Sequence, residues 1–248
     1  MSGPRYCLTG PIGTKATLGL IVLQVDETIE QDFRRIFTDP GVALYVTRIP
    51  SGAELTPDTI AEMGAALPRA TALLPQAAPF DVVGYACTSG TTLIGVETVA
   101  DMVSANVPTH AVANPLSATI AALRAVQARS VGIVSPYIET VAAPVAAALR
   151  AAGFTVPATL SFGEGVEARV ARIDPVSIRD AALEIGQTAG LDAVFLSCTN
   201  LRTLDILDAF DDQLVKPVIA SNQALAWHMA RLSGARLAAD APGRLFRL

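Results

Sequence analysis

The 248-residue sequence has little charge and few aromatic side chains. Charged residues make up 17% of it and aromatic residues 5%, whereas 51% is hydrophobic. Lys15 and Lys216 are the only lysines, and the arginines that supply the other basic charges are dispersed singly. Disorder requires low hydrophobicity with high charge, and nucleic-acid binding requires clustered basic side chains, so the composition excludes both classes.

Long hydrophobic runs are also missing. No apolar run reaches the roughly 18 residues that a membrane-spanning helix needs. Residues 1–5 lack the apolar segment that is typical of a secretory signal peptide. We therefore expect a cytoplasmic protein without a membrane partner.

Cysteine and histidine are scarce. The three cysteines are Cys7, Cys87 and Cys198, and the two histidines are His110 and His228. An odd cysteine count without a Cys-X-X-Cys pair or a Cys/His cluster argues against a disulfide framework and against a zinc site. The sequence also lacks a Gly-rich dinucleotide or phosphate-binding motif. We therefore expect chemistry that needs no cofactor and no metal.

Short β-branched runs alternate with longer segments rich in Ala and Leu. The runs predict strands over residues 18–23, 42–49, 82–86, 109–112, 130–135, 155–162, 193–197 and 218–220. The segments between them predict helices over residues 28–37, 57–74, 93–106, 115–128, 138–152, 175–189, 204–214 and 224–233. Continuous apolar strands are typical of parallel sheets that helices cover on both faces, so the alternation predicts an α/β fold.

An internal repeat is the most informative feature, with a period of about 110 residues. Three pairs of segments match in the same order, namely 17–22 with 130–135, 81–89 with 192–200, and 107–114 with 216–222. The repeat predicts two similar parallel-sheet halves related by a pseudo-twofold axis, residues 1–127 and 128–248, in which the C-terminal segment can cross over. We expect the active site in the cleft between the halves.

Cys87 and Cys198 follow predicted strands at equivalent points of the two halves. Ligands of open α/β sheets bind at the carboxyl ends of the strands, so the two thiols are expected to face each other. One thiolate can then remove a proton from a carbon beside a carboxylate while the other thiol protonates the opposite face. Alternatively, one thiolate adds to a double bond and allows rotation. Cys7 lies outside the repeat and is expected to be inert.

These motifs carry a family resemblance. Cys-Thr-Ser at 87–89 and Cys-Thr-Asn at 198–200, on a duplicated α/β chain, resemble the aspartate/glutamate racemase superfamily. Within it the sequence is similar to the branch of maleate cis-trans isomerases and arylmalonate decarboxylases, through residues 18–22, 135–137, 165–170 and 221–228. The segments 162–164, 170–173, 197–204 and 221–229 look closest to the ectoine-utilisation protein EutA. The resemblance implies a cofactor-independent racemase or isomerase of a small carboxylic acid, with both cysteines catalytic.

The resemblance also implies binding residues and a substrate preference. The positions that hold a substrate carboxylate in that branch are Thr88, Ser89, Tyr137, Thr199 and Asn200. Maleate isomerases carry Asn where this chain has Asp26 and Gly165, and arylmalonate decarboxylase has glycine where Cys87 stands. Two thiols therefore favour isomerisation over decarboxylation. An ionised Asp26 would attract an ammonium group and repel a second carboxylate, which favours an amino-acid-like substrate.

Several alternatives stay open at this point. Asp26 and Glu27 could simply cap the helix predicted over 28–37. Glu167 and Arg169 are expected to form ordinary helix contacts outside the site. A maleate cis-trans isomerase with Cys87 as nucleophile, an arylmalonate-type decarboxylase and a small-ligand binding module are the other functional hypotheses. Exposed apolar helices in an Ala-rich chain also favour a homo-oligomer.

Overall fold

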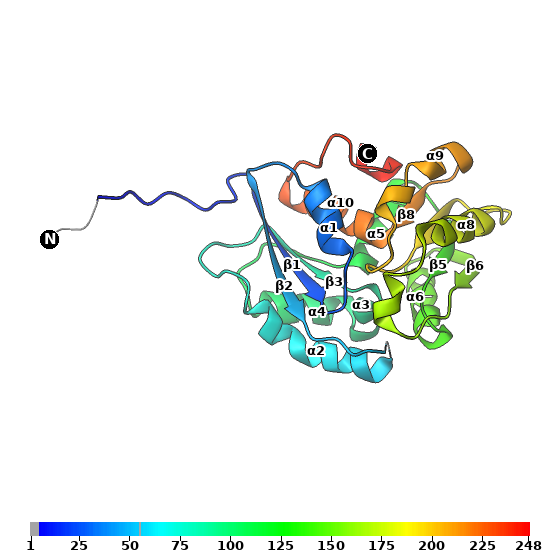
Figure 1. Ribbon diagram of the computed structural model, residues 1–248, viewed down its shortest axis with the longest axis horizontal. Helices are drawn as coiled ribbons and strands as arrows, with labels where there is room; N and C mark the ends of the chain where they lie inside the picture. Colours follow the sequence, from blue (N-terminus) through cyan, green and yellow to red (C-terminus); the bar gives the residue numbers. More distant parts are fainter. Residues whose placement is uncertain (1–4, 55) are drawn as a thin grey trace.

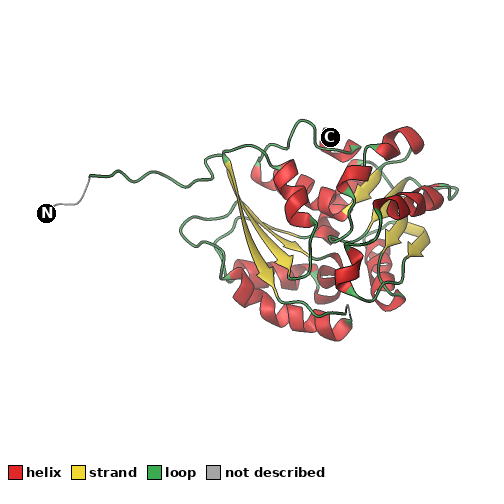
Figure 2. Ribbon diagram, viewed as in Figure 1, coloured by secondary structure: helices red, strands yellow, loops and turns green. Residues whose placement is uncertain are grey.

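The chain folds into two parallel four-stranded sheets with helices packed around them (Figures 1 and 2). The computed structural model describes residues 5–54 and 56–248, so the sequence argument about the first residues lies largely outside the described part. The strand order is β2-β1-β3-β4 in one sheet and β6-β5-β7-β8 in the other. This common order confirms the predicted α/β fold with two similar parallel-sheet halves.

Seven of the eight predicted strands agree closely with the structure, whereas the strand predicted over 109–112 is found at 112–113. The first sheet contains β1 (Ala16–Leu23), β2 (Val42–Ile49), β3 (Val82–Ala86) and β4 (Val112–Ala113). The second contains β5 (Ser130–Ser135), β6 (Thr155–Ser161), β7 (Ala193–Leu196) and β8 (Val218–Ala220). The inner strands β1, β3 and β7 are buried along their whole length, which explains their unbroken apolar sequence.

Helices follow most of the strands, and some begin at a recognisable capping signal. They are α1 (Ile29–Ile36), α2 (Pro57–Thr71), α3 (Thr88–Ile94), α4 (Val96–Ser104), α5 (Pro115–Ala125), α6 (Glu139–Ala151), α7 (Glu167–Val170), α8 (Pro175–Gly186), α9 (Ala209–Gln213) and α10 (Ser221–Ser233). Two short 3₁₀ helices are η1 (Leu204–Ile206) and η2 (Arg244–Arg247). Side chains of Thr56, Asn114 and Asp174 cap α2, α5 and α8, and Pro follows each cap at the start of the helix.

Several helix predictions were wrong in their bounds, and the helices predicted over 57–74, 115–128 and 175–189 each end three residues earlier. The helix predicted over 93–106 begins at Val96 as α4, and the separate helix α3 precedes it, because Gly95 has a φ of 102° and interrupts the helix. The helix predicted over 204–214 is η1 followed by α9. The helix predicted from residue 224 begins at Ser221, directly after β8.

Helix α10 belongs to the second half of the sequence but packs against the first half. It contacts α5, β3, α1 and β1 as well as β8. Gly84 of β3 allows this close approach, since a Cβ there would lie 2.7 Å from the sulfur of Met229. The chain therefore crosses back over the first sheet after completing the second one (Figure 1).

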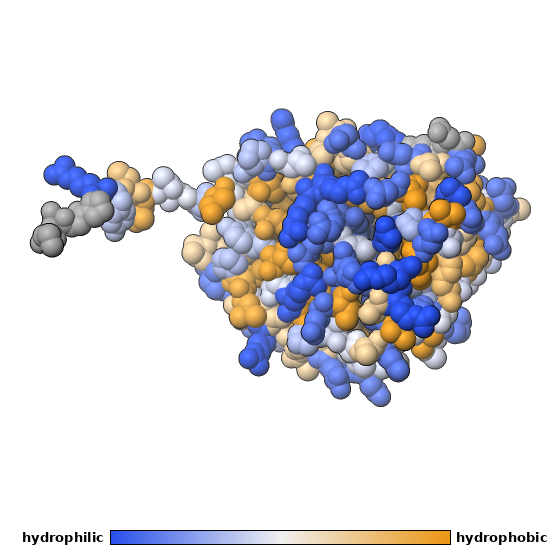
Figure 3. Space-filling model, viewed as in Figure 1, coloured by the Kyte–Doolittle hydropathy of each residue, from blue (hydrophilic) through white to orange (hydrophobic). Residues whose placement is uncertain are grey.

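The surface is mixed in character. Hydrophilic side chains cross the visible face and alternate with small hydrophobic areas (Figure 3). No helix in residues 5–54 and 56–248 is long and apolar enough to cross a membrane.

Candidate active site

The two repeated cysteines lie at the carboxyl ends of equivalent strands. Cys87 directly follows β3 and Cys198 follows β7, and their residues are only 3% and 4% exposed. Each sulfur accepts a backbone N–H from the turn behind it, from Gly90 at 3.1 Å and from Asn200 at 3.3 Å. Backbone donors of this kind stabilise a thiolate. Both thiols therefore have a partial anion site of their own.

Hydrogen bonds across the two halves tie the cysteine turns together. The hydroxyl of Thr199 donates to the carbonyl of Ala86 at 3.3 Å, next to Cys87. The hydroxyl of Thr88 lies 3.0 Å from that of Ser221, which accepts the backbone N–H of Cys198 at 3.1 Å. Thr199 thus bonds the backbone next to Cys87, and Thr88 contacts Ser221, which is bonded to the backbone of Cys198. The two thiol sites form one unit.

Further predicted binding residues lie beside the thiols. The hydroxyl of Ser89 is 3.7 Å from the sulfur of Cys87. Tyr137 is 2% exposed, and burial raises its pKa well above the usual value, with the charges of Cys198 and Cys87 adding to the shift. Asn200 accepts the backbone N–H of Glu27 at 2.9 Å. Hydroxyl and amide groups from both halves therefore surround the two sulfurs.

Asp26 follows β1 and is 2% exposed. One carboxylate oxygen accepts the N–H groups of Thr28 at 2.9 Å and Ile29 at 3.0 Å, so the side chain does cap α1. The other oxygen is buried and has no hydrogen-bond partner among the described residues. Burial raises the pKa of Asp26 to about 6. The helix cap uses only one of the two carboxylate oxygens, so the other is available to bind a ligand.

Glu167 belongs to the site, and the expectation that it makes only helix contacts was wrong. It begins α7, is 4% exposed, and its negative charge raises the pKa of both Cys87 and Cys198. Burial and then the charge of Asp26 raise its own pKa to about 7. The available signal was its position after β6, whose carboxyl end lies on the same edge of the sheet as Cys198. Arg169 forms an exposed ion pair with Glu164 at 3.2 Å, as expected.

The electrostatics of the closed site disfavour a thiolate. Burial raises the pKa of Cys87 to about 12 and that of Cys198 well above its usual value, and Glu167 adds to both shifts. The N–H and hydroxyl donors act in the opposite direction. Among the described residues, no cation is one of the groups that shift the pKa of either thiol most strongly. A positively charged ligand group would therefore favour thiolate formation.

Contacts between the halves cover the site. Glu54, in the loop after β2, forms an isolated antiparallel bridge with Val166, and the N–H of Glu167 donates to the carbonyl of Ala53 at 3.1 Å. Arg172 pairs with Glu27 at 2.8 Å on the other side of α7. These contacts hold α7 against the first half.

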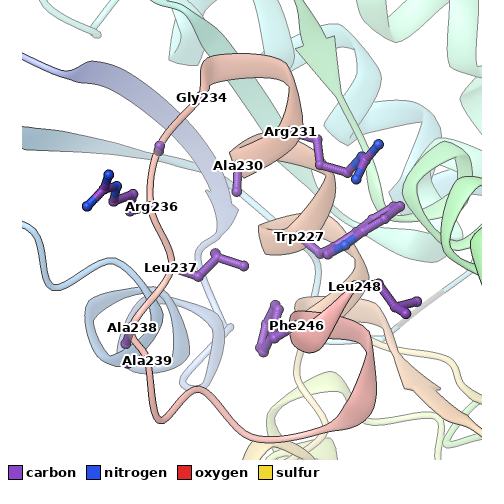
Figure 4. A pocket seen from close by; sticks show the side chains of 11 residues that line it. Trp227, Ala230, Arg231, Gly234, Arg236, Leu237, Ala238, Ala239, Phe246 and Leu248 are labelled. Atoms are coloured by element: carbon purple, nitrogen blue, oxygen red, sulfur yellow. The ribbon is translucent and has the colours of Figure 1, made fainter.

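Hollows also lie away from the thiols. A cavity of about 610 Å³ lies between α10 and the C-terminal segment, where Trp227, Leu237 and Phe246 line it (Figure 4). Arg231 lies over the ring of Trp227 at 5.0 Å from the centroid. Neither cysteine lines this cavity. Within the described ranges, no group of three or more His, Cys, Asp or Glu side chains is arranged to hold a metal ion.

The sequence is similar to one protein family and to two characterised enzymes. A family model described as arylmalonate decarboxylase matches residues 94–246. Maleate isomerase from Nocardia farcinica is 26% identical over 243 residues, which cover 93% of this chain and 95% of that protein. Arylmalonate decarboxylase from Bordetella bronchiseptica is 34% identical over 133 residues, which cover 52% and 55% of the two chains.

Solved structures show the same fold. Nocardia farcinica maleate cis-trans isomerase with a covalently bound succinylcysteine intermediate has a TM-score of 0.84 and 23% identity, over 94% of this chain and 98% of that one. Maleate isomerase from Pseudomonas putida S16 with maleate has a TM-score of 0.82 and 22% identity, over 93% and 97%. At these identities the likeness establishes the fold alone.

Proposed function

The chain belongs to the arylmalonate decarboxylase family, and on that premise we propose that it is a cofactor-independent isomerase of a small carboxylic acid. Cys87 and Cys198 are its acid/base pair. The observation that carries the proposal is that hydrogen bonds of Thr88 and Thr199 tie together the turns that hold two buried thiols, one from each half. A binding module would need no such matched pair of reactive groups.

The proposed reaction moves two protons. The substrate lies with its α-carbon between the sulfurs, and the Cys198 thiolate removes the α-proton. The Cys87 thiol then delivers its own proton to the opposite face, which inverts the configuration and leaves Cys87 as the thiolate. The reverse direction uses the same two groups in exchanged roles. Backbone N–H groups and hydroxyls around the thiols hold the carboxylate and stabilise the negative charge that develops at the α-carbon.

The two buried carboxylates favour a substrate with an amino group. Asp26 and Glu167 lie beside the thiols, and the second oxygen of Asp26 has no partner among the described residues. An ammonium group would pair with these carboxylates and would also offset their effect on the thiols. The motif resemblance to EutA belongs to this proposal, and we include amino acids derived from ectoine in the substrate screen.

Maleate cis-trans isomerisation is the second candidate. It is favoured by the similarity to the Nocardia farcinica enzyme over 93% of this chain. In this case the Cys87 thiolate adds to one carbon of the double bond, the new single bond rotates, and elimination of the thiolate restores the double bond. Asp26 and Glu167 would then have to be protonated, because each would otherwise repel the second carboxylate of maleate.

The Asp26→Asn variant separates the two candidates. An ionised carboxylate near an ammonium or a second carboxylate changes binding by about 1 kcal/mol or more at an effective dielectric near 20, which is about fivefold or more. We expect the variant to lose at least that factor in kcat/KM with an amino-acid substrate and to gain with maleate. A screen in D₂O, with NMR detection of α-proton exchange and of configuration, identifies the substrate first.

The pH dependence gives an independent check. Asp26 and Glu167 ionise at pH values of about 6 and about 7. Use of an amino-acid substrate should therefore rise through this range, whereas use of maleate should fall. Asp180→Asn, which removes an exposed carboxylate on α8, is the control and should change neither profile. Efficient maleate isomerisation by the wild type, weakened by Asp26→Asn, would overturn the assignment of an amino group.

A further inference from the structure

Tyr85 has a buried hydroxyl that the fold does not use. Its side chain lies on β3, two residues before Cys87, and is 0% exposed. Among the described residues its oxygen has no hydrogen bond of conventional geometry. A buried hydroxyl without a partner destabilises the folded state. Packing alone therefore favours phenylalanine at this position.

The second half of the repeat shows that the strand does not require a tyrosine. Alignment of the segments 81–89 and 192–200 places Leu196 of β7 opposite Tyr85 of β3. Leu196 is also fully buried and precedes Cys198 in the same way. The hydroxyl is thus a feature of the Cys87 side alone.

The thiol of Cys87 lies close to this hydroxyl. The Tyr85 oxygen and the Cys87 sulfur lie 2.7 Å and 2.8 Å from the point where a Cβ on Gly90 would be placed. Because Gly90 has no Cβ, the Tyr85 oxygen and the Cys87 sulfur can both lie beside it. Each group shifts the pKa of the other.

We propose that Tyr85 is a positioning residue whose hydroxyl becomes the hydrogen-bond donor to Cys87 when that cysteine is a thiolate. A neutral thiol is a weak acceptor, so the hydroxyl is poorly satisfied while Cys87 is protonated. After Cys87 has given its proton to the substrate, the sulfur carries a full negative charge and accepts the O–H strongly. Tyr85 keeps its own proton throughout, because burial raises its pKa well above the usual value.

Other groups also act on Cys87 and set the background. The N–H of Gly90 and the hydroxyl of Ser89, both from α3, favour its thiolate. Glu167 of α7 opposes it, and Tyr137, after β5, interacts with both sulfurs. Removal of the Tyr85 hydroxyl leaves these groups in place. The inference rests on the proposed role of Cys87, but it can be tested without any substrate.

The test compares Tyr85→Phe with wild type in the full-length protein. Cys87 is alkylated with iodoacetamide at a series of pH values, and peptide mass spectrometry measures its modification separately from that of Cys198. A lost hydrogen bond to a charged group predicts an alkylation rate of Cys87 that falls about tenfold at each pH. The rate of Cys198 should stay the same. The melting temperature should be unchanged or higher, since the variant removes an unpartnered polar atom.

A control distinguishes this role from a general packing effect. Tyr45→Phe removes a hydroxyl from β2, where the ring packs edge-on against Phe80, and should alter neither thiol. An unchanged Cys87 rate in Tyr85→Phe, or an equal loss at Cys198, overturns the inference. If no isomerase activity is found, the proposed function fails while the alkylation result still decides the role of Tyr85.

Discussion

A buried thiol is a poor base until something stabilises its anion. Burial is the largest cause of the raised pKa at both Cys87 and Cys198, and Glu167 increases the shift. The N–H groups of Gly90 and Asn200 offset only part of it. The remaining stabilisation has to come from the substrate. This requirement links the protonation state of the thiols to the charge of the molecule that binds between them.

Replacement of either catalytic cysteine by serine tests the acid/base pair. We expect Cys87→Ser and Cys198→Ser each to lower kcat by at least about 100-fold, because an alcohol is a far weaker proton donor and its anion forms far less readily. Circular dichroism should show an intact fold, since serine is nearly the same size. Turnover is measured with the substrate found in the D₂O screen.

Cys7→Ser is the matched control, because Cys7 is exposed and lies outside the repeat. It should keep full turnover. Near-normal turnover in either of the other two variants would exclude the two-base mechanism. Loss in Cys87→Ser with partial activity in Cys198→Ser would instead favour covalent addition by Cys87.

The sequence revealed the cysteine pair but not its full surroundings. Cys87 and Cys198 stand out because the repeat places both directly after a strand. Glu167 gave no such signal, because its burial depends on α7 being held against the other half of the chain. Tyr85 reads as an ordinary core residue until its oxygen is located beside a sulfur. Local patterns identify strand ends, whereas contacts between distant segments become visible only in the fold.

At the level of elements, we expect α7 and the loop after β2 to control access to the thiols. Glu54 and Val166 form a bridge between the two halves, next to the hydrogen bond from Glu167 to Ala53. A single bridge and one hydrogen bond are weak compared with a sheet edge. Opening on the timescale of loop motion is therefore expected to admit substrate.

A disulfide across this bridge should lock the site. Directly opposite residues of an antiparallel bridge have the spacing that a disulfide requires. We expect the oxidised Glu54→Cys/Val166→Cys double variant to lose at least about 90% of its turnover, and the reduced form to recover it, if the loop must open in each cycle. Alkylation of Cys87 and Cys198 should slow in parallel.

The two single variants, treated with the same oxidant, are the controls for unwanted bonds to the catalytic thiols. Both should keep their activity. An oxidised double variant that turns over at the wild-type rate would show that substrate enters by another route.

The ends of the strands and helices show which structural features a local sequence pattern can predict. Runs such as Val42–Ile49 and Ser130–Ser135 were predicted to the residue, because an apolar strand between turn residues is a local pattern. Helix α3 was missed because it begins directly after Cys87 and consists mainly of Thr, Ser and Gly, which are weak helix formers. The thiol itself accepts the N–H of Gly90 and caps this helix. A cysteine thus takes the place of the usual N-cap residue, so the sequence carries no ordinary signal for the start of this helix.

At the scale of the molecule, a buried polar network joins the halves behind the site. Asn222, on α10, donates to Asp32 of α1 and to the carbonyl of Thr199, each at 2.8 Å. Thr28 donates to the same carbonyl. Asp32 is 7% exposed, and burial raises its pKa to about 7. The side chains of Asp26, Asp32 and Glu167 are therefore three buried carboxyl groups close to the junction of the halves.

Raised carboxyl pKa values make the stability of the whole protein fall as pH rises. Between the ordinary value of 3.8 and about 7, the native state keeps a proton on Asp32 that the unfolded chain has released. This contribution is fully present at about pH 4 and is lost as the pH passes through about 7. Asp26 and Glu167 act in the same direction, with pKa values raised to about 6 and about 7. We expect the urea-unfolding free energy of the wild type to decrease over this range.

The Asp32→Asn variant isolates one of these groups. Its amide oxygen can still accept the N–H of Asn222, but the side chain no longer titrates. We expect the variant to gain stability relative to wild type between pH 4 and pH 8, by about 1.4 kcal/mol for each pH unit between the two pKa values as an upper limit. Asp180→Asn, on the exposed face of α8, should follow the wild-type curve. Parallel urea curves for Asp32→Asn and wild type at both pH values would mean that Asp32 is already ionised in the folded protein.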